Sequence, residues 1–245
     1  MQILLDVAYD GTAYCGWQWQ KNGVSVQETL EEGIKRALGL EVLRVAGASR
    51  TDAGVHALGQ RASFFAQGIK IPLDKLPLVI SSYLPKDICV FKAQEVPDDF
   101  SPRFNAKEKT YLYRYLVGSY PNPLLRHMTV FCPHELDVGK MGEAARLLEG
   151  EHDFAAFCAA GSSAKTTVRT VYECSVSESE GIVSIKVRGN GFLYNMVRII
   201  AGTLWQVGLG KNPPESAAIA LESRKREQAG KTAPAKGLCL VDIKY

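Results

Sequence analysis

The sequence of 245 residues lacks long hydrophobic runs and lacks a strong excess of either charge. Its hydrophobic content of 46% and charged content of 22% are those of a globular protein, and the net charge at pH 7 is +3. A fully disordered or fibrous chain is therefore excluded, and the charge alone indicates no particular partner. This length suits one large domain or two small ones, because domains commonly have about 100–150 residues.

No targeting or membrane segment is visible. The N-terminal residues Met1–Asp6 have no basic stretch, and Asp6 interrupts their apolar run. The best membrane candidate, Gly189–Gly210, carries Arg198 near its middle. A central arginine costs about 2.5–3.5 kcal/mol on membrane insertion scales. We therefore expect a cytoplasmic protein with no membrane partner, in which this stretch is a buried helix.

The common motifs of metal and nucleotide sites are also missing. The six cysteines are dispersed, with no Cys-x-x-Cys pair, and the four histidines form no His-Glu-x-x-His set, so reduced core thiols are expected and a structural metal is not. Walker A and Gly-x-Ser-x-Gly motifs are absent. Asp10-Gly11-Thr12 is similar to a phosphatase nucleophile loop, but Ala8 stands where that loop has its first aspartate.

Apolar periodicity predicts the element order β-α-β-β-α-β in each half of the chain. In the first half, the pattern predicts a half-buried strand over Ile3–Tyr9, a helix capped by Ser25, strands at Val42–Ala48 and Gln60–Ala66, a poorer helix at Pro72–Tyr83, and a strand at Ile88–Val96. In the second half it predicts a strand at Thr110–Val117, a helix from the Asp137 cap to Leu148, a hairpin of Val168–Ser177 and Ile182–Arg188, a helix at Leu193–Val207, a short helix capped at Asn212, and a strand at Leu238–Lys244.

This repeated order predicts an α+β fold of two tandem ferredoxin-like halves with antiparallel sheets and a central cleft. We place the halves at residues 1–104 and 105–245, with the boundary near Ser101–Lys109. Binding sites favour the interfaces between domains, so the cleft is the expected place for a substrate.

The densest polar cluster is Gly47–His56, which follows one predicted strand and precedes another. Its Thr-Asp-Ala-Gly run suits an ordinary turn, because such side chains hydrogen-bond locally. The same cluster crowds three ionisable groups, Arg50, Asp52 and His56, into seven residues, and functional residues concentrate on loops held by strands. A turn and a catalytic loop are both open.

Two further clusters have two interpretations each. Arg103–Tyr115 interleaves basic residues with aromatic ones, and Tyr111, Tyr113 and Tyr115 share one strand face. Tyrosine suits strands in general, but cations and aromatic faces also suit RNA phosphates and unstacked bases. Arg198 lies on an otherwise apolar helix and needs an anionic partner, which could be structural or catalytic.

The motifs together resemble the tRNA pseudouridine synthase A family over essentially the whole chain. The matching stretches are Tyr9-Asp10-Gly11-Thr12, Gly16-Trp17-Gln18, Arg50-Thr51-Asp52-Ala53-Gly54-Val55-His56, Lys109-Thr110-Tyr111-Leu112-Tyr113, Phe192-Leu193, Met196-Val197-Arg198, Thr232-Ala233-Pro234-Ala235 and Gly237-Leu238. The resemblance implies a cofactor-free isomerase, usually a homodimer, that converts uridine to pseudouridine at positions 38, 39 and 40 of the tRNA anticodon stem-loop.

The resemblance also implies roles for four residues. It places the catalytic aspartate at Asp52, the aromatic ring against the target base at Tyr111, and the arginine that pairs with the catalytic carboxylate at Arg198. Arg50 corresponds to a base-flipping or backbone-contacting arginine. The sequence does not choose between attack of Asp52 on C1′ and removal of the C2′ proton. A non-catalytic RNA-binding protein and a phosphohydrolase are the competing hypotheses. The first lacks the RNA-recognition signature and gives Asp52 and Arg198 no task, and the second is weakened by Ala8.

Overall fold

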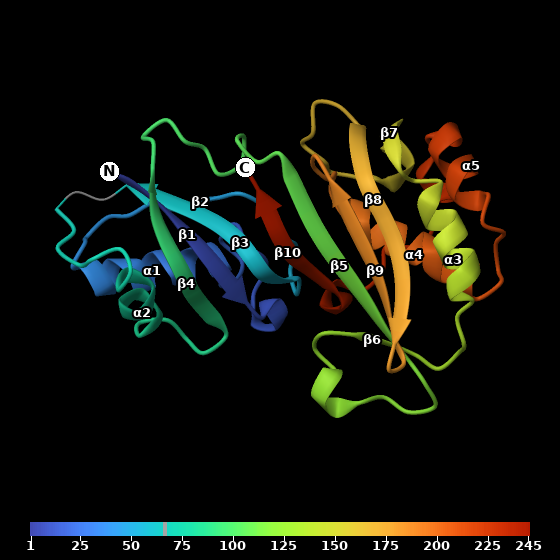
Figure 1. Cartoon of the computed structure of the whole chain (residues 1–245), viewed down its shortest axis with the longest axis horizontal. Coiled ribbons are helices and arrows are strands. Elements are labelled where there is room, and N and C mark those ends of the chain that lie inside the picture. Colours follow the sequence, from blue (N-terminus) through green and yellow to red (C-terminus); the bar gives the residue numbers. More distant parts are fainter. Residues whose placement is uncertain (66–67) are drawn as a thin grey trace. The chain divides into compact units, whose positions relative to one another are not determined.

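The computed structural model describes residues 1–65 and 68–245. The chain divides into two compact units, and each is described by itself: Met1–Lys107 with Leu240–Tyr245, and Glu108–Cys239. Both are mixed α+β with mostly antiparallel sheets (Figure 1). The α+β class expected from the sequence is thereby confirmed.

The first unit is built on a sheet in which the strands follow the order β4-β1-β3-β10, with β2 paired to β3. Its strands are β1 (Gln2–Tyr9), β2 (Ala46–Gly47), β3 (His56–Phe65), β4 (Ile88–Val96) and β10 (Leu238–Lys244). Strands β3 and β4 both run antiparallel to β1. The helices are α1 (Val26–Leu38) and α2 (Leu76–Ser81), which contact each other. The order β-α-β-β-α-β predicted for the first half is confirmed.

Strand β1 is buried on both faces, whereas a half-buried strand was expected. Even Asp6 is only 4% exposed, and it forms an ion pair with Arg61 of β3. The segment after β4 contacts the first residue of the strand. There, the carbonyl oxygen of Phe100 accepts a hydrogen bond from Gln2 Nε2 at 2.9 Å, and the Phe100 ring lies 4.9 Å from the ring of Tyr245. Burial of a charge is tolerated here because it is paired.

The predicted strand at Val42–Ala48 is wrong except for Ala46–Gly47. The reason lies in α1, whose side chains bond to the backbone of Val45. Glu31 Oε1 accepts from the Val45 amide at 2.9 Å, and Gln27 Nε2 donates to the Val45 carbonyl at 3.0 Å. Because the side chains satisfy these backbone groups, no strand ladder is needed there. The predicted end of the next strand, Ala66, lies outside the described residues.

Helix boundaries follow local signals in the first unit. Ser25 Oγ accepts from the Glu28 amide at 3.2 Å, which confirms the predicted cap of α1. The second helix was predicted over Pro72–Tyr83 with Pro77 as an interruption, but α2 begins only at Leu76. Pro77 therefore sits in the first turn, where its missing N–H has no partner to lose.

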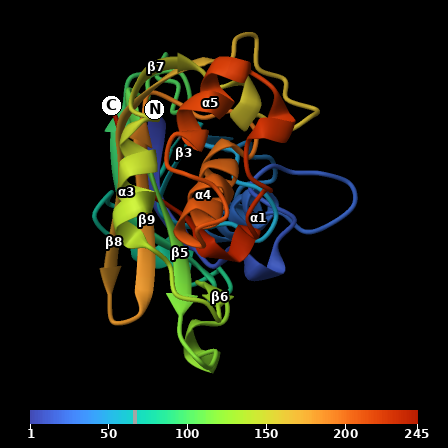
Figure 2. The ribbon, with the colours of Figure 1, turned by 90° about the vertical axis from the view of Figure 1, so that its right-hand side faces the viewer.

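The second unit has its main sheet in the order β5-β9-β8-β7, with the short β6 parallel to β5. Its strands are β5 (Glu108–Val117), β6 (Val130–Cys132), β7 (Gly150–Asp153), β8 (Val168–Ser179) and β9 (Ile182–Gly189). Its helices are α3 (Val138–Arg146), α4 (Met196–Gly208) and α5 (Ser216–Ser223). Helix α3 packs against β8 and α4, and α4 in turn contacts β5 (Figure 2).

The predicted hairpin and the Asp137 cap are confirmed. Glu180 and Gly181 both have positive φ angles, as a two-residue hairpin turn requires, and Asp137 Oδ1 accepts from the Lys140 amide at 3.0 Å. The short helix predicted after an Asn212 cap instead begins at Ser216. Pro214 biases Pro213 away from helical backbone, so the helix starts after both prolines.

The strand predicted to close the second half, Leu238–Lys244, forms as β10 but adjoins β3 in the sheet of the first unit. Most of it, from Leu240 onward, belongs to that unit. The C-terminal strand thus returns to the N-terminal part of the chain.

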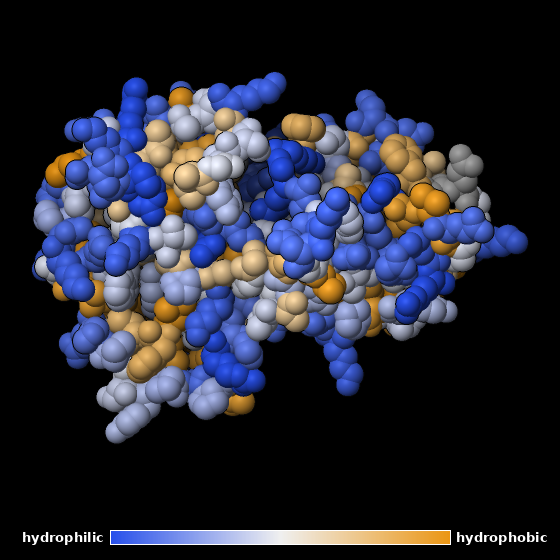
Figure 3. Space-filling view, turned by 180° about the vertical axis from the view of Figure 1, so that it is seen from behind, coloured by the Kyte–Doolittle hydropathy of each residue, from blue (hydrophilic) through white to orange (hydrophobic). Residues whose placement is uncertain are grey.

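Among the described residues, no helix is long and apolar enough to cross a membrane. Apolar and polar side chains alternate over the face seen in Figure 3. All six cysteines lie in the described ranges, and no disulfide joins any two of them.

Candidate active site

The polar cluster around Asp52 forms a loop between β2 and β3 of the first unit. We call Ser49–His56 the aspartate loop. Asp52 is half-buried, Arg50 is exposed, and Thr51 and His56 are buried at 7% and 6% exposure. The placement of the cluster on a loop held by strands, as the sequence suggested, is confirmed.

Hydrogen bonds from buried side chains hold the aspartate loop in place. The hydroxyl groups of Tyr9 and Thr51 lie 2.7 Å apart, which ties the loop to the end of β1. Gln60 of β3, fully buried, accepts from the Ser49 amide at 3.1 Å and donates to the Ser49 carbonyl at 2.7 Å. The Trp17 amide donates to the Thr51 carbonyl at 3.0 Å. Ser49 and Thr51, which both precede Asp52, are therefore fixed before any substrate binds.

Two glycines let a second loop approach the aspartate loop closely. A Cβ on Gly11 would lie 2.0 Å from the Val55 carbonyl oxygen, and one on Gly16 would lie 2.7 Å from the Thr51 carbonyl oxygen. Gly16 also has a φ of +109°, which favours glycine. Gly11 and Gly16 belong to motifs of the family resemblance, and they allow the segment that contains them to pack closely against the aspartate loop. We call this packed segment the cradle of Asp52.

The cradle predicts a large effect for Gly11→Ala. The added methyl group must displace the Val55 carbonyl, so we expect a loss of about 1–3 kcal/mol in unfolding free energy. Catalysis should fall further, by about 100-fold, because a catalytic group displaced by about 1 Å loses that much. Gly142→Ala in α3 is the matched control, since nothing lies within 4 Å of its Cβ and the helix should gain stability. Thermal unfolding and single-turnover rates compare the two. An active, fully stable Gly11→Ala protein would contradict the cradle.

His56 and Asp10 form a second polar pair beside the loop. His56 Nδ1 lies 3.0 Å from Asp10 Oδ1 and 3.1 Å from the Gly11 amide nitrogen. The two contacts need different tautomers, because Nδ1 donates to the carboxylate but accepts from the amide. Asp10 Oδ1 already accepts from the Thr12 amide at 2.9 Å, as the cap of a short 3-10 helix, Gly11–Ala13. We favour the tautomer in which Nδ1 accepts from the Gly11 amide, since that amide is fixed in the backbone and Asp10 Oδ1 already accepts from the Thr12 amide. No sequence pattern indicates this pairing, because Asp10 and His56 lie in separate motifs.

Tyr111 lies on β5 of the second unit and is 7% exposed. Its ring meets the ring of Phe192 edge-on, with centroids 5.2 Å apart and planes at 89°. The period-two prediction for this strand is confirmed, because Tyr113 and Tyr115 are buried on the same face, with ring centroids 5.0 Å apart.

Tyr113 and Tyr115 are core residues with buried hydroxyl groups. Tyr113 donates to the Pro234 carbonyl at 2.8 Å, and Tyr115 donates to the Ala201 carbonyl at 3.2 Å. Burial raises the pKa of Tyr113, and the positive charge of Arg198 opposes that rise. This electrostatic influence indicates that Arg198 lies near the Tyr113 phenol.

Arg198 stands in the first turn of α4 and is half-buried, not fully buried as expected. Its Nε donates to the Ala233 carbonyl at 2.8 Å, and its Nη1 donates to Asn195 Oδ1 at 2.8 Å. The segment that contains Ala233 also bonds its amide to the Arg198 carbonyl at 3.1 Å. A guanidinium held from two directions keeps a fixed orientation.

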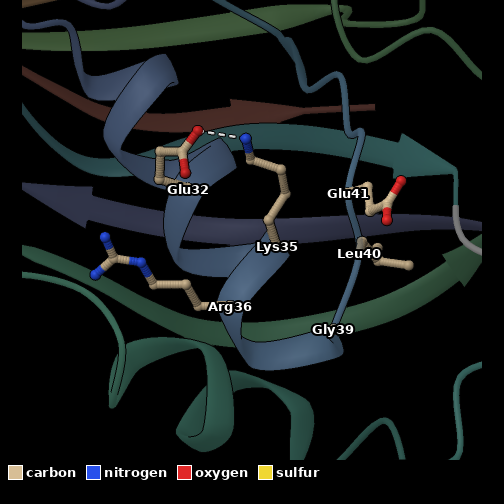
Figure 4. Close-up of a pocket in the computed structure, with 6 residues that line it drawn as sticks. All are labelled: Glu32, Lys35, Arg36, Gly39, Leu40 and Glu41. Atoms are coloured by element: carbon tan, nitrogen blue, oxygen red, sulfur yellow. Dashed lines mark ion pairs between the residues drawn. The ribbon is translucent and has the colours of Figure 1, made fainter.

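Two surface hollows lie outside these groups. One of about 270 Å³ is lined by residues at the C-terminal end of α1, and Figure 4 shows Lys35 paired with Glu32 there. Another of about 270 Å³ is lined mainly by the segment between β5 and β6. Neither hollow includes a residue of the aspartate loop. Within the described ranges, no three His, Cys, Asp or Glu side chains are grouped as metal ligands would be.

A carboxylate on a rigid loop, together with arginines and aromatic rings, provides the groups for acid–base or nucleophilic chemistry on an anionic, aromatic substrate. Enzymes that modify RNA bases form such a class. A family model described as tRNA pseudouridine synthase matches residues 7–105 and 144–245. Asp52, Arg50 and Arg198 fall in the matched ranges, and Tyr111 falls between them.

Several relatives are similar over nearly their whole length. The tRNA pseudouridine synthase A of Acetivibrio thermocellus is 48% identical over 243 residues, which is 99% of both chains. The proteins of the same name from Thermoanaerobacter pseudethanolicus and Caldicellulosiruptor bescii are each 47% identical, again over 99% of both chains. The chain belongs to the tRNA pseudouridine synthase family, and it is an enzyme that isomerises uridine to pseudouridine in tRNA.

Proposed function

We propose that the enzyme acts on the uridines at positions 38, 39 and 40 of the tRNA anticodon stem-loop, with Asp52 as its catalytic residue. The observation that carries this proposal is the aspartate loop, in which the half-buried Asp52 directly follows a segment that Tyr9, Gln60 and Trp17 hold by hydrogen bonds. Preorganised catalytic groups need no rearrangement during the reaction. The full-length similarity to proteins named tRNA pseudouridine synthase A supports the choice of substrate.

The chemistry needs a carboxylate and no redox partner. The C1′–N1 bond breaks, the detached base turns, C5 joins C1′, and the proton on C5 is lost while N1 gains one. Atoms and electrons balance within the nucleotide, so no step calls for an external oxidant or reductant. Ionised Asp52 either attacks C1′ as a nucleophile or removes the C2′ proton. The target base must first leave its stack, which costs a few kcal/mol.

Three further residues complete the proposed site. Tyr111 stacks against the target base, Arg198 pairs with the catalytic carboxylate, and Arg50 contacts the RNA backbone or helps to flip the base. An opposing arginine favours the charged form of an aspartate and can lower its pKa by about 1–3 units. The split donation of Arg198, through Nε and Nη1, supports a role that depends on orientation.

We also propose a division of the chain into halves, an oligomeric state and a cellular location. We take the chain as two tandem ferredoxin-like halves, residues 1–104 with the aspartate loop and 105–245 with Tyr111 and Arg198, of which the last strand residues, from Leu240 onward, fold with the first unit. The strand order β4-β1-β3, with β2 paired to β3, supports this for the first half. The protein is proposed to be cytoplasmic and a homodimer, and size measurement in solution tests the dimer.

Incubation with unmodified tRNA tests the function. Carbodiimide mapping should detect pseudouridine at positions 38 to 40, while the mass of the RNA stays unchanged because the reaction is an isomerisation. Binding without any conversion would favour the RNA-binding alternative, and a change in RNA mass would favour phosphoryl chemistry. Conversion at other positions would reject the proposed substrate site while leaving the activity intact.

Tyr111 variants separate stacking from proton transfer. Tyr111→Phe should retain much of the tRNA affinity, and Tyr111→Ala should lose stacking worth about 1–3 kcal/mol together with catalysis. A large rate loss in Tyr111→Phe alone would assign the hydroxyl group a proton-transfer role. Binding and single-turnover conversion are compared at one fixed salt concentration.

Tyr113→Phe is the neighbouring control. On the sequence alone it should be nearly neutral, but its hydroxyl group bonds to Pro234, so we now expect a stability loss of about 1 kcal/mol. Its conversion rate should stay close to that of the wild type. Should Tyr111→Ala convert uridine as fast as the wild type, Tyr111 is only a strand residue.

A further inference from the structure

An exposed turn after β4 presents an arginine and an aromatic ring side by side. Phe104 is 82% exposed, and the guanidinium carbon of Arg103 lies over its ring, 5.4 Å from the centroid. The face of a ring exposed in this way is accessible to an unstacked base. An arginine stacked on its face keeps that ring oriented.

The turn is rigidly built. Ser101 and Asn105 close it through two hydrogen bonds, from the Asn105 amide to the Ser101 carbonyl at 2.9 Å and from the Ser101 amide to Asn105 Oδ1 at 2.7 Å. The Pro102 carbonyl accepts from the Tyr245 hydroxyl group at 3.0 Å. Arg103 and Phe104 are therefore displayed by an anchored turn of the first unit.

The positive charges of Arg103 and Arg50 act on each other, and in the described part of the chain neither guanidinium forms an ion pair with a carboxylate. Burial of the guanidinium lowers the pKa of Arg103, and the positive charge of Arg50 lowers it further, although the residue as a whole is exposed. Among the described residues, neither arginine has a carboxylate oxygen within 4.0 Å, and Arg50 Nη1 donates to Gln18 Oε1 at 3.4 Å. Two neighbouring cations repel each other, and an anion beside them relieves that repulsion.

We propose that Arg103 and Phe104 form a second RNA contact, in which Arg103 holds a phosphate of the substrate strand together with Arg50, and Phe104 stacks on an unpaired base. Arginine suits phosphate because its donors match two oxygens at once. Aromatic faces take any base without hydrogen-bond readout. Since Arg50 is two residues from Asp52, the held phosphate belongs next to the target uridine. This inference rests on the proposed function, because it takes RNA as the substrate.

Binding of tRNA by five variants tests the contact. Arg103→Gln should raise Kd about fivefold at physiological salt and should lower the slope of log K against log salt by about 0.7–0.9, the share of one phosphate. Arg103→Lys keeps the charge and should keep that slope. Phe104→Ala should raise Kd by about fivefold or more, with the salt slope unchanged. Conversion at saturating tRNA should stay near the wild-type rate in all three, so KM changes and kcat does not. The last two variants are Arg50→Gln alone and Arg50→Gln with Arg103→Gln, and the double variant should lose less binding free energy than the sum of the two single changes.

Matched controls lie elsewhere in the first unit. Arg36→Gln removes an exposed arginine of α1, and Phe91→Ala removes a ring of β4 that is 52% exposed. Both should leave Kd and the salt slope unchanged. Thermal unfolding of each variant shows whether the protein still folds. Where Arg103→Gln is unstable, the Kd and salt slope of Arg103→Lys still test the role of the charge.

The outcomes separate the two proposals. Failure of the wild-type protein to form pseudouridine in tRNA would overturn the proposed function itself. A wild type that converts uridine, with Arg103→Gln and Phe104→Ala binding tRNA as tightly and with the same salt slope, would overturn this contact and leave the function standing. Equal losses of tRNA affinity in the Arg36→Gln and Arg103→Gln proteins would show a general charge effect and would also overturn the proposed contact.

Discussion

Asp52→Asn is expected to abolish uridine isomerisation while leaving the fold and tRNA binding largely intact. The amide has nearly the same size as the carboxylate, but it can neither attack C1′ nor remove a proton. Loss of one acid–base group costs about 100- to 10,000-fold in rate, and loss of a nucleophile costs at least as much. Single-turnover conversion of unmodified tRNA measures the rate, and a separate titration measures Kd.

Asp52→Glu shows whether position matters as well as charge. The carboxylate is restored, but it stands about one methylene farther from the loop that Tyr9, Gln60 and Trp17 hold fixed. We expect a loss of about 100-fold, because rigid sites do not follow a displaced group. Asp74→Asn, at an exposed acid paired with Lys75, is the control and should be as active as the wild type. Appreciable turnover by sequence-verified Asp52→Asn protein would falsify the catalytic assignment.

The parts of the fold that the sequence predicted are those with local signals. The strand Ile88–Val96 has the predicted bounds, and the caps Ser25 and Asp137 accept the bonds expected of them. The Glu180-Gly181 turn is likewise encoded by adjacent residues. Each of these signals lies within a few residues of the structure that it determines, so no knowledge of packing is needed.

The errors arise where distant residues decide. Val45 was expected in a strand, but its backbone bonds to Glu31 and Gln27 of α1, which no local pattern reveals. Burial of Asp6 is compensated by its ion pair with Arg61, 55 residues away by number. Tertiary contacts of this kind override propensity.

In the candidate site too, residues marked by a local pattern could be predicted, and those that matter through distant contacts could not. The crowding of Arg50, Asp52 and His56 marked the aspartate loop, and the family motifs marked Tyr111 and Arg198. The cradle could not be foreseen, because Gly11 and Gly16 matter only through the space that the aspartate loop leaves for them. Composition likewise could not reveal that Phe104 is exposed on an anchored turn, since an isolated phenylalanine usually indicates core.

Arg198→Met is expected to reduce conversion severely, by about 100-fold or more, through loss of the cation proposed to pair with the catalytic carboxylate. Arg198→Lys should also be impaired. Lysine has one donor nitrogen, whereas Arg198 donates to Ala233 through Nε and to Asn195 through Nη1. A single ammonium cannot occupy both positions, so the charge returns without its orientation.

Part of any loss will be structural, because Arg198 ties the Ala233 segment to α4. Asn195→Gly separates the two effects. Glycine accepts the left-handed backbone of position 195, where φ is 60°, but removes the side-chain oxygen that orients the guanidinium. We expect Asn195→Gly to remain folded and to convert uridine at a rate between those of Arg198→Lys and the wild type. Thermal unfolding recorded beside each rate distinguishes lost catalysis from lost fold. A well-folded Arg198→Met protein with a wild-type rate would exclude the pairing, and it would leave Asp52 without the cation that the family resemblance gives it.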